Sequence, residues 1–133
     1  DAVEATDADF ADALFPADGV PAAYGLVGEQ DGEVVAMAVW YLTFSTWTGR
    51  PGIRLEDLFV DPAHRGGGLG KALLLRLAEI CVERGYRRLE WWVLRRNTPS
   101  IDFYDSLDAT PMDEWIDYRV DGQNLIRLGG GAT

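Results

Sequence analysis

Cysteine, histidine and lysine are nearly absent from this chain: each occurs once among its 133 residues. A single cysteine, Cys81, excludes an internal disulfide framework, and a single histidine, His64, leaves a zinc site without its usual ligands. Long apolar runs and a basic-then-apolar signal segment are missing as well, so neither a membrane span nor a leader is expected. The sequence therefore predicts a cytoplasmic protein with no bound metal and no membrane partner.

Basic residues are missing from the first 49 positions, which contain nine of the 22 acidic residues. The formal net charge is −10, and a surface of that sign repels DNA, RNA and anionic membranes while it attracts small cations. Nucleic acid is therefore excluded as the main partner. With 47% hydrophobic residues the chain can bury a core, and its length fits a single domain over residues 1–133, with a flexible tail over 129–133.

Hydrophobic spacing and turn residues predict an alternation of strands and helices. The dipeptide Asp31-Gly32 favours a hairpin, and Gly85 stands where a long helix would need its C-terminal cap. The apolar pattern predicts helices over 7–15, 69–84, 97–107 and 121–128, and strands over 22–29, 33–43, 53–60, 88–94, 109–112 and 115–120. Strand, helix, strand, helix, strand is the pattern of an α/β fold.

A glycine-rich segment, Arg65–Lys71, lies between the strand that ends at Val60 and the longest helix. Glycines there let backbone N–H groups approach an anion, and a helix N-terminus adds partial positive charge. The Walker A pattern would need Gly at 65 and Ser or Thr at 72, where Arg65 and Ala72 stand. The Rossmann pattern would need Gly at 71, where Lys71 stands. Both nucleotide motifs therefore fail.

The spacing that does fit is R-x-x-G-x-G, formed by Arg65, Gly68 and Gly70. It lies inside a longer block, Leu55–Gly70, which reads LEDLFVDPAHRGGGLG, and a second block, Asn97–Tyr104, reads NTPSIDFY. Together the two blocks resemble the GCN5-related N-acetyltransferase (GNAT) superfamily, in the branch of the spermidine/spermine (diamine) and thialysine acetyltransferases.

This resemblance runs from about Asp7 to Leu128 and implies a GNAT-type fold, a mixed and mostly antiparallel sheet flanked by helices. The family's first strand and helix have no counterpart before the helix over 7–15, so the expected fold lacks these two elements. The resemblance also implies acetyl-CoA as co-substrate, a small cationic amine as second substrate, and a homodimer. A helix-capping glycine of the family is replaced by Asp108, which tolerates the left-handed conformation better than most residues do.

The resemblance assigns the binding of acetyl-CoA to three segments. A strand would offer backbone groups to the pantetheine arm, the glycine loop would hold the pyrophosphate, and the start of a later helix would contact the arm. In sequence order these residues are Leu58, Phe59, Val60, Arg65, Gly66, Gly67, Gly68, Leu69, Gly70, Lys71, Asn97, Pro99 and Ser100. The ordinary alternatives are a strand core for the first three, solvated surface charge for Arg65 and Lys71, and a helix cap for Asn97.

By the same resemblance, Tyr104 is the general acid that protonates the departing CoA thiolate, a step that suits a phenol of pKa about 10. Glu56 would bind the substrate ammonium and help to remove its proton through water, because an alkylammonium of pKa about 10.4 cannot attack until it is deprotonated. Asp57 is expected on the other face of the strand. The amine cleft would be lined by Glu90, Trp91, Trp92 and Glu114, with a core or rim role as the alternative.

These residues predict an enzyme, an N-acetyltransferase in which the amine attacks the thioester directly in a ternary complex. The expected acceptor is a primary amine of a small cationic molecule of the diamine or polyamine kind. Two alternatives stay open: acetylation of thialysine or another amino-acid side-chain amine, and a CoA-binding module without turnover.

Overall fold

The computed structural model describes residues 3–131, so residues 132 and 133 of the expected tail lie outside the described residues. The chain divides into two compact units after Trp92. The first unit contains a four-stranded sheet in the order β1-β2-β3-β4, in which β1, β2 and β3 are antiparallel neighbours and β4 is parallel to β3. In chain order the strands are β1 (Tyr24–Gln30), β2 (Glu33–Ser45), β3 (Arg50–Val60) and β4 (Leu89–Trp91).

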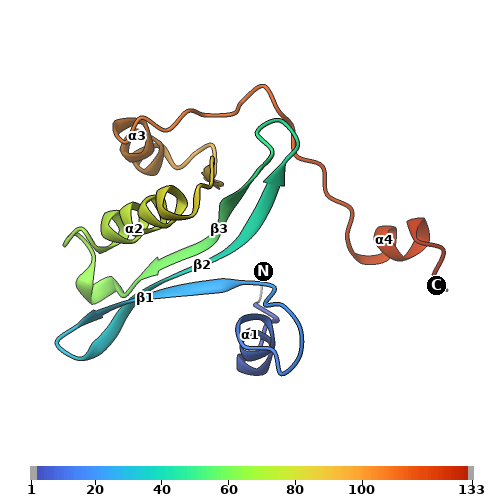
Figure 1. The fold of residues 1–133 in the computed structure, drawn as a ribbon, viewed down its shortest axis with the longest axis horizontal. Coiled ribbons are helices and arrows are strands. Elements are labelled where there is room, and N and C mark those ends of the chain that lie inside the picture. Colours follow the sequence, from blue (N-terminus) through green and yellow to red (C-terminus); the bar gives the residue numbers. More distant parts are fainter. Residues whose placement is uncertain (1–2, 132–133) are drawn as a thin grey trace. The chain divides into compact units, whose positions relative to one another are not determined.

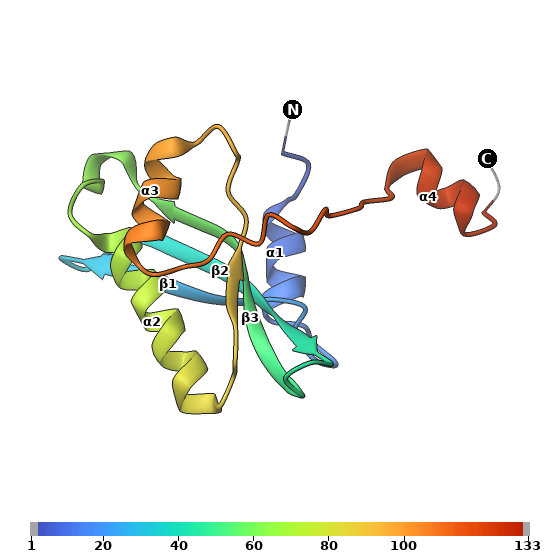
Figure 2. The same ribbon diagram turned by 90° about the horizontal axis from the view of Figure 1, so that it is seen from above.

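Two α-helices and the short 3-10 helix η1 (Pro62–His64) complete the described part of the first unit. In Figure 1 and Figure 2, α2 (Leu69–Arg84) lies on one face of the sheet and α1 (Asp7–Leu14) on the other. The expected mixed α/β fold is confirmed. The described residues contain no helix that is both long and apolar enough to cross a membrane.

The core of the first unit lies where α2 packs on the sheet. Ile53 of β3 and Leu77 of α2 are both 0% exposed. The other core side chains come from β2, β3 and α2: Val35, Ala36, Ala38, Trp40, Leu55, Leu73, Leu74, Ile80 and Cys81. The expected turn and helix cap are confirmed, since Asp31 and Gly32 turn with φ of 53° and 80° and Gly85 caps α2 with φ of 73°. β2 and β3 are longer than expected, because β2 ends at Ser45 and β3 begins at Arg50.

β3 contains an extra residue opposite β2. In the register of the two strands, Leu55 pairs with Trp40 and Asp57 pairs with Val39, so Glu56 has no partner and forms a β-bulge. The bulge changes which face of the sheet the following side chains meet, because side chains alternate along a regular strand.

This change of phase matches the apolar pattern of β3. Ile53 and Leu55 are buried before the bulge, whereas Leu58 and Val60 follow it one residue out of phase. A Cβ on Gly70, in the first turn of α2, would lie 3.5 Å from Leu58 Cδ2 and 3.9 Å from Val60 Cγ2. The bulge therefore lets both apolar pairs of β3 face α2.

β4 stays beside β3 over three residues only. The pairs are Ile53–Leu89, Arg54–Glu90 and Leu55–Trp91. β4 then ends, while β3 continues to Val60, so the strand expected over 88–94 is shorter than predicted. In the sheet formed by residues 3–131, the edge of β3 that faces away from β2 has no strand partner after Leu55.

The second unit contains α3 (Thr98–Ser106) and α4 (Gly122–Leu128). Both helices were expected. Asn97 caps α3, because its Oδ1 accepts a hydrogen bond from the backbone N–H of Ser100 at 3.3 Å.

The strands expected over 109–112 and 115–120 are wrong, since both segments are irregular. A strand needs a neighbour for its backbone hydrogen bonds, and no strand pairs with either segment in the described part of the chain. Pro111 also lacks the N–H that a ladder requires. The apolar side chains of the second segment are not buried against a core, because Trp115 and Tyr118 are 68% and 90% exposed.

Asp108 follows α3 in a left-handed conformation, at the position where the family resembled has a helix-capping glycine. Asp108 has φ of 62°, and the backbone N–H of Ala109 donates to Tyr104 O at 3.3 Å. A Cβ in this conformation crowds the following carbonyl, at a cost of roughly 1–2 kcal/mol for most residues. The predicted left-handed role of Asp108 is confirmed.

Replacing Asp108 by Gly is expected to stabilise the protein by about 1 kcal/mol, because glycine adopts a positive φ without strain. Urea denaturation of the full chain, followed by circular dichroism, measures the change. Asp102→Gly is the matched control, since the same substitution inside α3 should lower stability by about 0.3 kcal/mol. An unchanged or lowered midpoint for Asp108→Gly would speak against strain at this position.

Candidate active site

The glycine loop leaves the end of β3 and leads into α2. Gly66 and Gly68 adopt left-handed conformations with φ of 86° and 83°, and no described atom lies within 4 Å of a Cβ position on either. α2 begins after Gly68 with no side-chain cap and no acidic residue in its first turn. The first N–H groups of α2 therefore lack a side-chain partner, and an anion bound there would satisfy them.

Two cations flank this uncapped helix start. Arg65 is tied to the strand, because its Nε donates to Val60 O at 3.0 Å and its guanidinium carbon lies 5.7 Å from the centre of the Phe59 ring. Lys71 is exposed in the first turn of α2 and forms no ion pair within residues 3–131. The loop thus fits a pyrophosphate in geometry and in charge.

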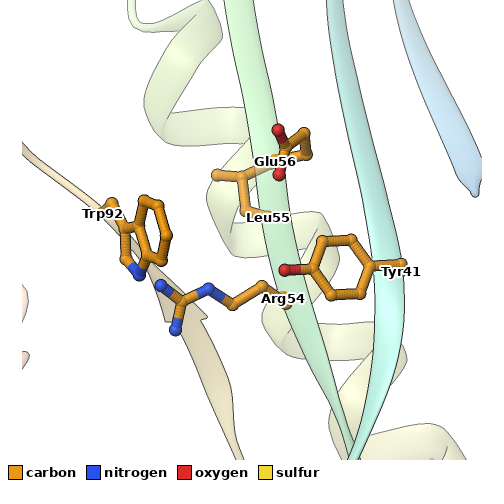
Figure 3. Close-up of a pocket in the computed structure, with 5 residues that line it drawn as sticks. All are labelled: Tyr41, Arg54, Leu55, Glu56 and Trp92. Atoms are coloured by element: carbon orange, nitrogen blue, oxygen red, sulfur yellow. The ribbon is translucent and has the colours of Figure 1, made fainter. Parts of the chain in front are cut away.

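A small pocket of about 80 Å³ lies beside the bulge (Figure 3). It is lined by Tyr41 from β2, by Arg54, Leu55 and Glu56 from β3, and by Trp92, which follows β4. The guanidinium carbon of Arg54 lies 4.7 Å from the centre of the Trp92 ring, a cation–π contact. In Figure 3 the Tyr41 hydroxyl points toward Arg54, and the Glu56 carboxylate lies apart from the guanidinium. The pocket therefore offers an anion, a cation and a phenol.

Arg54 is a half-buried cation with an unsatisfied donor. Its Nη2 atom is enclosed and has no hydrogen-bond acceptor among the described residues. Within residues 3–131, no ion pair joins Arg54 to Glu56 or to Glu90, its register neighbour on β4. An unpaired buried donor costs about 1–3 kcal/mol. Because Nη2 is covered by protein atoms, a ligand acceptor could reach it only after the Arg54 side chain moves.

The structure brings together two of the predicted amine-site residues, Glu56 and Trp92. Glu90 and Trp91 are half-buried on β4 and do not line this pocket. The expectation that Asp57 and Glu56 face opposite ways assumed regular alternation, which the bulge interrupts at this point.

Sequence reasoning missed Arg54 and Tyr41. They are directly opposite each other on β3 and β2, a relation that depends on cross-strand register and is not written in either segment alone. One usable signal was present, since Arg54 stands two residues before Glu56 and that spacing tends to repeat a face of a strand.

In the second unit, the predicted CoA-contacting segment Asn97–Ser100 forms the start of α3, and Tyr104 lies near its end. The rings of Tyr104 and Phe103 are 5.6 Å apart between centres. Burial raises the pKa of the Tyr104 phenol, which therefore stays neutral over a wider pH range than an exposed tyrosine. Glu114 is exposed in the irregular segment after α3.

Two other kinds of site were considered in residues 3–131, a metal site and a cysteine nucleophile. No group of three or more His, Cys, Asp or Glu side chains gathers there. Cys81 is buried in α2, and burial raises the pKa of its thiol, which disfavours the nucleophilic thiolate.

Comparison with known proteins places this geometry in a family. A model of the acetyltransferase (GNAT) family matches residues 2–108. The chain is 35% identical over 107 residues to a thialysine N-epsilon-acetyltransferase of Sus scrofa, which covers 77% of this chain and 62% of that protein. It is 31% identical over 97 residues to the spermidine/spermine N(1)-acetyltransferase-like protein 1 of Homo sapiens, over 71% of this chain and 14% of that protein. The chain thus spans less than two thirds of the length of the first of these relatives.

Solved structures support the same assignment. An integron cassette protein from the mobile metagenome of V. cholerae is 26% identical, with a TM-score of 0.78 over 94% of this chain and 78% of that chain. An acetyltransferase of Trypanosoma brucei is 29% identical, with a TM-score of 0.60 over 74% of this chain and 68% of that chain. The resemblance drawn from the two sequence blocks is confirmed at the level of the family.

Tyr104 is expected to lose its proton above the ordinary phenol pKa of about 10. Between that value and its raised pKa, stability should fall as pH rises, because the unfolded chain releases the proton first. Ultraviolet titration of tyrosinate in the full chain and in Tyr104→Phe isolates this phenol. Tyr118→Phe is the matched control, since Tyr118 is 90% exposed. A Tyr104 component that titrates at or below the ordinary value would rule out the effect of burial.

Proposed function

The chain belongs to the acetyltransferase (GNAT) family, and on that premise we propose that it transfers an acetyl group from acetyl-CoA to a primary amine of a small cationic molecule, a diamine or polyamine. The observation that carries the proposal is the succession of features from Glu56 to Gly70. A carboxylate at a bulge, an open strand edge and a glycine loop before an uncapped helix follow one another along the chain. They suit an amine, an acyl arm and a pyrophosphate, in that order.

Acetyl-CoA supplies an acetyl group activated as a thioester. The backbone N–H groups of Gly66–Lys71 would hold its pyrophosphate, with positive charge from Arg65 and Lys71. The open edge of Leu58–Val60 would bind the amide groups of the pantetheine arm as an added strand does. In the second unit, Asn97, Pro99 and Ser100 are the remaining candidates for contact with the arm.

Glu56 is assigned to the substrate amine. An alkylammonium has a pKa of about 10.4 and reacts only as the free base, so the site must bind the cation and accept its proton. Glu56 is exposed at the pocket, where water can relay that proton. Trp92 supports a cation at the same place, and Glu90, Trp91 and Glu114 are proposed as further cleft residues.

Tyr104 is assigned to the leaving group. As the amine nitrogen bonds to the acyl carbon and the C–S bond breaks, the phenol would give its proton to the thiolate sulfur. The raised pKa supports this role, because it keeps the phenol protonated while the site operates.

Acetylation of thialysine or another amino-acid side-chain amine is the second candidate function. Two observations favour it: several relatives are named thialysine N-epsilon-acetyltransferases, and Arg54, which lines the pocket, forms no ion pair within residues 3–131 and could bind a carboxylate. A CoA-binding module without turnover is the candidate from another class, and the assay below distinguishes it.

We also infer a cytoplasmic homodimer that binds neither nucleic acid nor membrane. The resemblance to the diamine branch supports the dimer, and the net charge of −10 supports the lack of binding to nucleic acid and to anionic membranes, because both are negatively charged. Light scattering coupled to size exclusion measures the mass directly.

Thiol release from acetyl-CoA is expected to accelerate when diamines, polyamines or thialysine are added to the full chain. Tyr104→Phe should lower kcat by about 100-fold or more, the usual contribution of a general acid, whereas Tyr118→Phe should not. If CoA binds in calorimetry while no amine accelerates thiol release, the chain is a binding module. Full kcat for Tyr104→Phe at every pH would exclude Tyr104 as the acid.

Removing both loop cations, Arg65→Met with Lys71→Met, should weaken CoA binding by about tenfold or more, because charge-assisted contacts to phosphate are lost. Calorimetry with CoA measures the change. The matched control is Arg84→Met with Arg87→Met, which removes the same charge from exposed positions outside the loop. Equal affinities for the two double variants would place the pyrophosphate elsewhere.

A further inference from the structure

We propose that Arg54 is a carboxylate-binding residue, and that the pocket therefore favours a linear amino acid over a diamine. The side-chain amine of the amino acid would lie at Glu56 and its α-carboxylate at Arg54. This inference rests on the proposed acetyl transfer, and it selects the second candidate substrate, an amino-acid side-chain amine, over the diamine or polyamine proposed first.

Arg54 is available for a ligand. It lines the pocket, its guanidinium carbon lies 4.7 Å from the centre of the Trp92 ring, which orients the group, and no carboxylate of the described residues pairs with it. A guanidinium carries five N–H donors in a planar fork that matches a carboxylate. The guanidinium of Arg54 is therefore oriented by Trp92 and could bind a carboxylate of a ligand.

The phosphates of CoA do not fill that role. Arg54 precedes Val60 by six residues of β3, about 20 Å of strand, and the glycine loop begins beyond Val60. The pyrophosphate site already has its own cations in Arg65 and Lys71. The anion for Arg54 must therefore come from the other substrate.

The order of the two charges along β3 suits a substrate that carries an amine at one end and a carboxylate at the other. Arg54 and Glu56 are two residues apart on β3, so their Cα atoms are separated by about 7 Å or less. An amino acid whose amine lies three or four methylene groups from the α-carbon spans that length when extended. The space of about 80 Å³ suits a small head group.

A diamine meets the wrong charge at this position. Its second ammonium would lie near the Arg54 guanidinium, and like charges repel in a partly buried site. The α-carbon of an amino acid carries a carboxylate for Arg54 and an ammonium for which the Tyr41 hydroxyl is an acceptor. Figure 3 shows that hydroxyl pointing toward Arg54.

Substrate pairs that differ only in the α-carboxylate test the inference. We would measure thiol release from acetyl-CoA by the full chain with L-lysine against 1,5-diaminopentane, and with L-ornithine against 1,4-diaminobutane. Each amino acid is expected to exceed its diamine by about tenfold or more in kcat/KM.

Arg54→Met keeps the apolar stem on Trp92 and removes the charge. It should raise the KM for the amino acids by about 10–100-fold with little change in kcat, so that the ratio of kcat/KM for each amino acid to that for its diamine falls by at least tenfold. Retained diamine acetylation also shows that the variant is folded. Arg50→Met, at the exposed start of β3, is the matched control and should change neither class.

Equal rates for each pair in the unmodified chain would overturn the inference and leave acetyl transfer standing, as would an equal loss of both classes in Arg54→Met. If no amine is acetylated, the proposed function fails instead. Calorimetry of L-lysine and 1,5-diaminopentane with the CoA-bound chain then decides about Arg54. Tighter binding of lysine that Arg54→Met abolishes supports the assignment, and equal binding of the two refutes it.

Discussion

Glu56 of β3 forms a bulge against β2, directly after Leu55, where the pairing of β3 with β4 ends. The bulge keeps the apolar side chains of β3 on α2 on both sides of the break, so the core tolerates it. The end of pairing with β4 leaves one edge of the strand without hydrogen-bond partners. Because a strand bonded on both edges cannot bind another chain, the acyl-arm site depends on this break. The pocket lies just before the break and the glycine loop just after it.

The net charge of this protein differs from the local charge at its proposed binding sites. The net charge of −10 suits a cationic amine, yet the proposed co-substrate is strongly anionic. Arg65, Lys71 and the uncapped start of α2 resolve the conflict at one end of β3. Arg54 and Glu56 place opposite charges two residues apart near the other end, with no ion pair between them in the described residues. An amino acid with a side-chain ammonium, which brings one carboxylate and a net positive charge, suits such a pair better than a diamine dication does.

Features with short-range causes could be predicted from the sequence. Asp31-Gly32, Gly85 and Asn97 each act through their own backbone or the next turn, and the structure confirms all three. The Arg54–Tyr41 pair depends on the register between two strands. The strands expected over 109–112 and 115–120 needed strand partners, which the apolar pattern of each segment does not reveal. The two sequence blocks identified the family, because the residues of a binding site keep a characteristic spacing along the chain that can be recognised without knowing how the chain packs.

The most direct test of the break in β3 is residue-resolved amide hydrogen exchange of the full chain with and without CoA. We expect CoA to slow exchange at Gly66–Lys71 and at amides within Leu58–Val60, because these groups would gain hydrogen-bond acceptors. Exchange in the turn at Asp31-Gly32 should not change. If CoA binds but amide exchange is unchanged both within Leu58–Val60 and within Gly66–Lys71, the proposed acetyl-CoA site is wrong.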